Sequence, residues 1–181
     1  MLSRLALAMS ILMSLSIPAS TQHAQPYAGL QTRAVKALSD QQIADLRAGR
    51  GMGLALAAEL NGYPGPLHAF ELRRELDLSE AQAARAQDLF DAMKMETIPL
   101  GENVIAAEAA LDRQFAGRSI TLASLDAATL RIGEAQAKLR AAHLRYHLAM
   151  LEVLTPDQIA RYSALRGYPS GTPHRGHHQR H

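Results

Sequence analysis

Several residue classes that mark familiar kinds of protein are scarce in this chain. It has no cysteine and no tryptophan, and aromatic residues fill 4% of its 181 positions. The lack of cysteine excludes disulfides, thiolate metal ligands and cysteine nucleophiles, although it does not argue against export. The alternating β-branched runs that strands need are also missing. Because 48% of the residues are apolar, with alanine and leucine prominent, we expect an all-α fold with a core built by helix packing.

The chain also lacks a large excess of either positive or negative charge. Lysine and arginine number 19 against 17 for aspartate and glutamate, which leaves a formal net charge of +2. No basic cluster is dense enough to follow a phosphate backbone, so we expect no binding to nucleic acid. No serine lies in a Gly-x-Ser-x-Gly motif, and no nucleophile stands beside a base. We therefore expect no catalytic residues and no enzymatic activity.

The N-terminus has the pattern of a secretory signal. A short basic start precedes the apolar run from Leu5 to Ile17, and small residues follow it. The run is too short to span a bilayer and has no stop-transfer flank, so residues 1–24 are interpreted as a signal peptide. We expect cleavage after Ala19, with Ala24 as the alternative, and a periplasmic mature protein. Retention of the segment would instead anchor the protein in the membrane.

Three helix starts in the sequence share the same chemistry. A leucine precedes a serine or threonine that can cap the helix, and a glutamine three residues after the cap can close a capping box. The boxes are Leu38-Ser39-Asp40-Gln41-Gln42, Leu78-Ser79-Glu80-Ala81-Gln82 and Leu154-Thr155-Pro156-Asp157-Gln158. In the third box Pro156 occupies the first helical position, where its missing N–H leaves no bond unmade.

Breakers and composition divide the chain into four parts. Residues 1–24 are the signal peptide, and residues 25–65 are a variable region with short helices and a Gly/Pro linker. Residues 66–168 are the main helical domain, and residues 169–181 are a His-rich tail that we expect to be disordered without a ligand. The glycine run 49–53 follows no strand, so it is interpreted as a hinge rather than a phosphate loop.

The main domain is predicted to be a helical hairpin of about four helices. Pro99 and Gly101 lie within the second helix and are expected to break or kink it. The four helices are expected to begin at Pro66, Ser79, Leu122 and Thr155, and Gly117 is the natural end of the second.

The long helix from Leu122 carries two apolar stripes. The first has a period near 3.5 residues, and the second lies roughly 120° around the helix from it. We expect the neighbouring helix to cover one stripe and a second subunit or a client protein to cover the other. The alternative is burial of both stripes within a monomeric bundle. The first stripe contains Leu125, Thr129, Ile132, Gln136, Leu139, His143, Tyr146 and Met150, and the second contains Leu130, Ala137, Ala141, Leu144, Leu148 and Leu151.

Histidines on the long helix are the leading candidates for a chemical site. His143 and His147 are four residues apart, a spacing at which two imidazoles can share one Zn²⁺, Ni²⁺ or Cu²⁺ ion. The further ligands that we consider are His68, at the start of the first helix, and Glu108, a carboxylate within an apolar stripe. The glutamate of a His-Glu-x-x-His metalloprotease is absent. The alternative interpretation makes His143 a hydrogen-bonded core residue and His147 a surface residue.

The C-terminal tail is a second candidate metal site. Neutral imidazoles spaced along a flexible segment bind divalent metals weakly and reversibly. The tail histidines are His174, His177, His178 and His181. No cofactor is required for either site, and the metal is open among zinc, nickel and copper.

Residues 66–168 resemble the Spy/CpxP family of bacterial periplasmic proteins, which carry a Leu-Thr-x-x-Gln motif. The third capping box agrees with that motif in full, and in the second box Ser79 replaces threonine. The order and lengths of the predicted helices and the signal peptide are similar as well. The resemblance covers a little over half of the chain.

This resemblance implies an all-α hairpin that forms a homodimer, which we expect to be antiparallel, shaped as a curved cradle. Family members include ATP-independent chaperones that hold unfolded clients, repressors of an envelope stress sensor, and a branch that senses or buffers heavy metals. The metal branch carries histidine on the long helix together with histidine and glutamate from earlier helices, to which His143, His147, His68 and Glu108 are similar in kind. We expect a periplasmic chaperone of the stress response, and the alternative is a periplasmic metal sensor or buffer.

Overall fold

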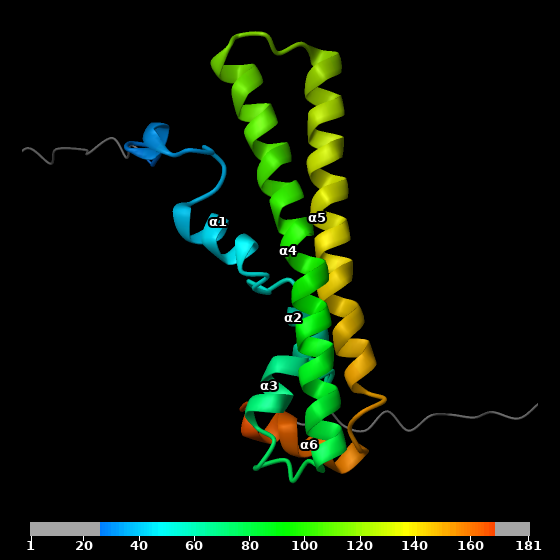
Figure 1. The fold of residues 1–181 in the computed structure, drawn as a ribbon. Coiled ribbons are helices and arrows are strands. Elements are labelled where there is room, and N and C mark those ends of the chain that lie inside the picture. Colours follow the sequence, from blue (N-terminus) through cyan, green and yellow to red (C-terminus); the bar gives the residue numbers. More distant parts are fainter. Residues whose placement is uncertain (1–25, 169–181) are drawn as a thin grey trace, which may run out of the picture.

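A computed structural model describes residues 26–168 (Figure 1). The predicted signal peptide, residues 1–24, and the predicted tail, residues 169–181, lie outside this range. Within it the chain forms helices and no strand, which confirms the all-α prediction. None of the helices between residues 26 and 168 has both the length and the apolar character needed to cross a membrane. The elements are a 3₁₀ turn η1 (Leu30–Thr32) and the α-helices α1 (Asp40–Arg47), α2 (Leu56–Glu59), α3 (Pro66–Glu71), α4 (Glu80–Ala116), α5 (Leu122–Met150) and α6 (Pro156–Leu165).

The frame of the fold is an antiparallel hairpin of the two long helices α4 and α5 (Figure 1). All three predicted capping boxes are present, with both hydrogen bonds made in each, at the starts of α1, α4 and α6. A fourth box starts α5, where Thr121 and Ser124 exchange the same two bonds. Each box satisfies two backbone N–H groups that a helix start would otherwise leave unpaired.

Pro99 does not break α4, because the helix continues through it to Ala116. Pro99 is exposed, so water can reach the carbonyl group of Met95, which loses its intrahelical partner. The predicted break is therefore absent. The second half of α4, which follows Pro99, leans away from α5 (Figure 1).

Gly101 serves close packing between α4 and α1. A Cβ atom at Gly101 would lie 2.5 Å from the carbonyl oxygen of Leu46, at the end of α1. This approach lets α1 lie on α4 and bury a cluster of apolar side chains between them. The cluster contains Val35, Leu38, Leu46, Val104, Ile105 and Leu139.

The open end of the hairpin, where α4 begins and α5 ends, is closed by α3 and α6 (Figure 1). A second buried cluster fills this end, and Tyr162 of α6 lies at its centre with no exposed surface. The cluster contains Ala69, Leu76, Ala86, Leu89, Met150, Leu154 and Tyr162. The open end of the hairpin and the middle part beside α1 therefore have separate cores (Figure 1), and the segment between α1 and α3 crosses the hairpin between them.

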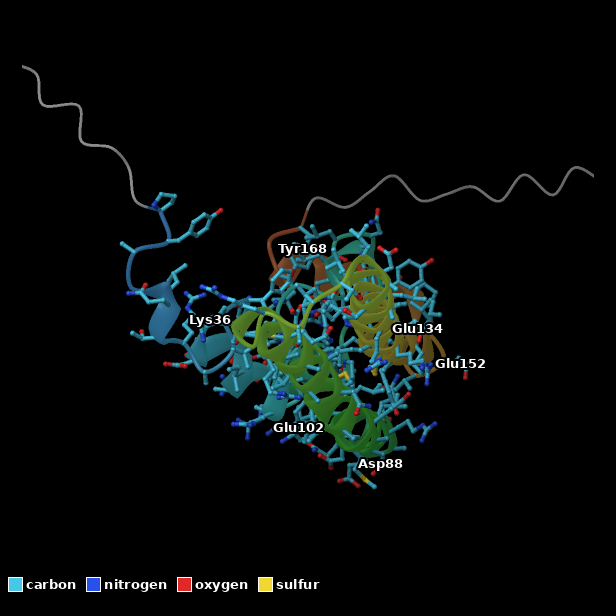
Figure 2. All side chains as sticks on the ribbon, turned by 90° about the horizontal axis from the view of Figure 1, so that it is seen from above. Lys36, Asp88, Glu102, Glu134, Glu152 and Tyr168 are labelled. Atoms are coloured by element: carbon cyan, nitrogen blue, oxygen red, sulfur yellow. The ribbon has the colours of Figure 1, made fainter. Side chains whose placement is uncertain are left out.

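The two stripes of α5 have different surroundings. In the first stripe Ile132, Leu139 and Met150 are buried, although Thr129 and Gln136 are exposed. Within residues 26–168 the second stripe is largely exposed apart from the partly buried Leu144, and the exposed fractions of Leu130 and Leu148 are 65% and 57%. Figure 2, which views the hairpin along its length, shows Glu134 and Glu152 on one side of α5, and helical spacing places both at the edge of the second stripe. The described part of the chain, residues 26–168, therefore does not bury both stripes.

Candidate functional site

A cavity of about 540 Å³ lies where the segment from Ala48 to His68 crosses the hairpin. The glycine run 49–53 forms part of its wall, and one turn of α4 around Met93 forms another part. Glycine permits the close packing here, because a Cβ atom at Gly65 would lie 3.0 Å from Cε1 of His147. The three histidines of the main helical domain that were predicted as metal ligands all line this cavity: His68, His143 and His147.

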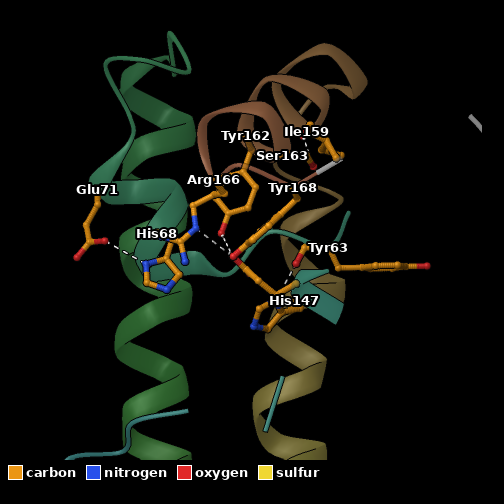
Figure 3. A network of polar contacts seen from close by, with 10 residues as sticks. Tyr63, His68, Glu71, His147, Ile159, Tyr162, Ser163, Arg166 and Tyr168 are labelled. Atoms are coloured by element: carbon orange, nitrogen blue, oxygen red, sulfur yellow. Dashed lines mark hydrogen bonds and ion pairs between the residues drawn. The ribbon is translucent and has the colours of Figure 1, made fainter. Parts of the chain in front are cut away.

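His147 is held in a defined orientation. Its Nδ1 donates a hydrogen bond to the carbonyl oxygen of Tyr63 at 2.8 Å (Figure 3). Because a carbonyl oxygen can only accept, the neutral ring keeps its lone pair on Nε2. The exposed fraction of His147 is 7%, so the alternative that placed His147 on the surface is wrong.

His143 is buried one helical turn before His147 and lacks a hydrogen bond. Its exposed fraction is 2%, and its Nε2 atom is buried with no protein partner. Burial lowers the pKa of His143 below its usual value of 6.5, and the nearby His147 lowers it further. The ring is therefore neutral near pH 7, which is the form that binds metal ions. The alternative of a hydrogen-bonded core histidine does not hold for this atom.

The carboxylate of Glu59, at the end of α2, is buried beside His147. Its Oε1 atom accepts hydrogen bonds from the hydroxyl groups of Tyr162 (2.5 Å) and Tyr168 (3.2 Å), and it lies 3.4 Å from Nε of Arg166 (Figure 3). Its Oε2 atom is buried without a hydrogen bond and lies 3.7 Å from Nδ1 of His147. Burial of Tyr162 and its bond to Glu59 raise the pKa of the Tyr162 hydroxyl far above its usual value. Oε1 thus has three partners, whereas Oε2 has no hydrogen bond.

The charged side chains that line the cavity are mostly basic. Glu59 is the only acidic residue among the described residues that line it, and Arg166 is its ion-pair partner. Arg50 is paired with Asp45 at 2.6 Å. The ammonium group of Lys94 lies 5.7 Å from the centre of the Phe90 ring. The wall is therefore basic apart from Glu59, and a cation that enters is attracted chiefly to the free oxygen of this residue.

Of the other two predicted ligands, His68 lines the same cavity and Glu108 does not. His68 is partly exposed at the edge of the cavity, where its Nδ1 lies 3.1 Å from Oε2 of Glu71 (Figure 3). Glu108 does not line the cavity, since it lies 14 residues beyond Lys94 on α4, or roughly 21 Å along the helix at 1.5 Å per residue. Glu108 is half-buried, and burial raises its pKa.

Glu59 is the carboxylate that sequence reasoning missed. It lies in residues 25–65, which were assigned as a variable region, and nothing local links it to the long helix. One signal was present, because Glu59 stands in the apolar run Leu54 to Leu60. A lone carboxylate in such a run is expected to have a hydrogen-bonding or charged partner. Glu108 was selected by the same reasoning.

The arrangement offers two imidazoles and one carboxylate, which are ligands that suit Zn²⁺, Ni²⁺ and Cu²⁺. Within residues 26–168, however, no three His, Asp or Glu side chains converge closely enough to hold an ion without moving. The tail histidines lie outside these residues. Comparison of the chain with protein-family models, with curated proteins and with solved structures found no match.

Proposed function

We propose that this protein binds a divalent transition metal ion, Zn²⁺, Ni²⁺ or Cu²⁺, in the cavity between His143, His147 and Glu59. One observation carries the proposal. Oε2 of Glu59 and Nε2 of His143 are both buried without a hydrogen bond, and both residues line the same cavity. Buried polar atoms are nearly always paired, and an unpaired one in a native protein needs an explanation such as a bound ion. Two such atoms beside one cavity support a shared ligand.

The surroundings of His147 support a metal in particular. A metal-binding imidazole commonly donates its second ring N–H to a carbonyl group, which fixes the ring and leaves the lone pair on the other nitrogen. The bond from Nδ1 of His147 to Tyr63 is of this kind. His143 lies on the same face of α5, one turn before His147. Its lowered pKa favours the neutral ring, whose lone pair can bind a cation. With the predicted signal peptide, these features suggest a periplasmic metal sensor or buffer.

Calorimetric titration tests this function. Zn²⁺, Ni²⁺ and Cu²⁺ are titrated separately into the mature chain from residue 25 and into a His143→Ala/His147→Ala variant. We expect the variant to lose at least about tenfold in affinity for the preferred metal. His68→Ala is the comparison, because His68 lies at the edge of the cavity with Glu71 as its partner, and we expect a smaller loss. Equal affinity of the mature chain and the double variant would contradict the proposal.

A second candidate function rests on the exposed stripe of α5. Contiguous exposed apolar surface marks sites that bind other proteins, and Leu130 and Leu148 are largely exposed. We propose, as the alternative, that this stripe holds unfolded client proteins, an envelope sensor protein or a second copy of the chain, as the resemblance to the Spy/CpxP family implies. The second and third capping boxes, whose sequences carry that resemblance, contact each other through Gln82 and Gln158.

Light scattering of an aggregating client tests the alternative. We expect suppression at stoichiometric ratios by the mature chain and little suppression by a Leu130→Gln/Leu148→Gln variant. Both substitutions are on the surface, where most changes shift stability by less than about 0.5 kcal/mol. If the unmodified chain does not slow aggregation, the chaperone function is excluded.

A further inference from the structure

We infer that the cavity also binds Cu⁺, for which Met52 and Met93 supply thioether ligands beside the imidazole rings of His143 and His147. Both methionines line the cavity together with these histidines. Cu⁺ lies outside the proposed function, which concerns divalent ions, but the inference rests on that function because both kinds of ion use the same imidazoles. Three features carry it: the ligand types in the wall, the course of the glycine run 49–53, and the charge of the wall.

The ligand types in the cavity wall favour a soft ion. In residues 26–168 no three His, Asp or Glu side chains converge closely enough to hold an ion, and the chain has no cysteine. A complete site in this part of the chain therefore needs another kind of ligand. The thioether sulfur of methionine is such a ligand, and thioethers select Cu⁺, whereas imidazole suits copper in general. Two methionines and the two histidines of α5 thus give four ligands, none of them a carboxylate.

Met52 lies in the glycine run beside His143. A Cβ atom at Gly51, the residue before Met52, would lie 3.9 Å from Nδ1 of His143. Met52 itself has a φ of 42°, in the left-handed region that long side chains rarely adopt. Backbone conformations of this kind cluster at ligand-binding sites, where the surrounding structure holds them. The exposed fraction of Met52 is 42%, so its side chain can turn on three rotatable bonds to bring the sulfur to an ion.

Met93 reaches the same space from α4. It belongs to the turn of α4 that forms part of the cavity wall, and its exposed fraction is 8%. The glycine run passes next to this turn, because a Cβ atom at Gly49 would lie 3.7 Å from Cα of Lys94. The run therefore lies against α4 next to Met93 and against α5 at His143, so both thioethers and the imidazole border one space.

The charge of the cavity wall favours a monovalent ion. Arg50, Lys94 and Arg166 are basic, and Glu59 alone is acidic among the described lining residues. Because Coulomb energy is proportional to charge, each basic group repels Cu⁺ half as strongly as it repels a divalent ion at the same distance. The net repulsion from the wall is therefore smaller for Cu⁺ than for Zn²⁺, Ni²⁺ or Cu²⁺.

Measurement of Cu⁺ and Zn²⁺ affinities on the same variants tests the inference. Cu⁺ is kept reduced with ascorbate in the absence of oxygen, and its affinity is measured by competition with the coloured chelator bicinchoninate. The variant is Met52→Leu/Met93→Leu, because leucine is apolar, similar in volume and well tolerated in place of methionine, but it has no sulfur. Met95→Leu is the matched control, since Met95 is on the same helix, has an exposed fraction of 80% and does not line the cavity. Circular dichroism checks that each metal-free variant is folded.

Thioether ligation predicts that the mature chain binds Cu⁺ and that Met52→Leu/Met93→Leu binds it at least about tenfold more weakly. The same variant should retain its affinity for Zn²⁺, whose protein ligands are imidazole, carboxylate and thiolate groups. We expect Met95→Leu to leave both affinities unchanged and His143→Ala/His147→Ala to weaken both. X-ray absorption of the Cu⁺ complex should show sulfur neighbours in the mature chain and their loss in the double methionine variant.

The other outcomes overturn the inference in distinguishable ways. Equal Cu⁺ affinities of the mature chain and Met52→Leu/Met93→Leu, or binding of Zn²⁺ but not Cu⁺ by the mature chain, overturn it and leave the proposed divalent site standing. Equal losses of Cu⁺ and Zn²⁺ affinity in the methionine variant would show that the methionines shape the cavity without binding the ion, which also overturns it. A mature chain that binds neither Cu⁺ nor any of the three divalent ions overturns the proposed metal function as well.

Discussion

Gln82 and Gln158 exchange two hydrogen bonds. Nε2 of Gln82 donates to Oε1 of Gln158 at 2.8 Å, and Nε2 of Gln158 donates to Oε1 of Gln82 at 3.2 Å. Each Oε1 atom also accepts the backbone N–H of its own cap, from Ser79 at 3.0 Å and from Thr155 at 2.9 Å. The second and third capping boxes therefore form one structure, which joins the first turn of α4 to the first turn of α6.

This pairing predicts strong coupling between the two glutamines. Either Gln82→Ala or Gln158→Ala removes both mutual bonds, one capping bond and the bonds that the amide donates to backbone carbonyl groups, so each should cost about 1–3 kcal/mol of unfolding free energy. Together they should cost less than the sum, with a coupling of about 0.5–2 kcal/mol. Urea unfolding of the four proteins measures the cycle. Additive losses would show that the boxes act independently.

Two glycines in long helices should respond to alanine with opposite signs. Gly101→Ala places a Cβ atom 2.5 Å from the Leu46 carbonyl oxygen, and such overpacking against backbone should cost about 1–3 kcal/mol. Gly133, inside α5, has no atom within 4 Å of an added Cβ, so Gly133→Ala should gain about 0.5–1 kcal/mol from helix propensity. Thermal unfolding of the two variants measures both effects. If Gly101→Ala is stabilising, α1 does not lie on α4 as described.

Stability should fall in mild acid because of His143. Its folded pKa lies below its usual value of 6.5, so the unfolded state binds the proton more readily in the window below about pH 6.5. The contribution of neutral His143 to the unfolding free energy is therefore complete above this window and is lost as pH falls through it, by up to about 1.4 kcal/mol per pH unit.

Denaturant unfolding between pH 5 and pH 8 measures this dependence. His143→Gln retains a polar side chain of similar size but does not titrate, so its stability should vary less with pH across the same window. The comparison uses the slope against pH, because the substitution also changes the absolute stability. An unchanged slope would mean that His143 is not the responsible group.

Local chemistry made the helix starts predictable. Ser39, Ser79 and Thr155 each have a glutamine three residues later, and all three boxes are formed. The box at Thr121 was missed because its partner is Ser124, which has a shorter side chain than the glutamine of the usual pattern. Pro99 was expected to break or kink α4, but an exposed carbonyl group can be hydrated, so a proline on this face does not end the helix.

The candidate site was only partly predictable, because it depends on contacts between distant segments. His143 and His147 could be paired from their spacing on one helix. Their carboxylate neighbour could not, since Glu59 is 84 residues before His143 in the chain and reaches the cavity only because the segment from Ala48 to His68 crosses the hairpin. Glu108 was chosen by the same reasoning that applies to Glu59, but periodicity alone does not show which carboxylate a histidine will meet.

The most direct test of the metal function is the affinity of a Glu59→Gln variant. Glutamine keeps the size of the side chain and an oxygen that can accept from Tyr162 and Tyr168, but it removes the charge and the carboxylate ligand. Titration of Zn²⁺, Ni²⁺ and Cu²⁺ into the mature chain and into this variant is the measurement, with circular dichroism to confirm that both are folded. We predict tight binding of one of these metals by the mature chain and at least about a tenfold weaker affinity in the variant. Equal affinities, or no tight binding by the mature chain, would contradict the proposed site.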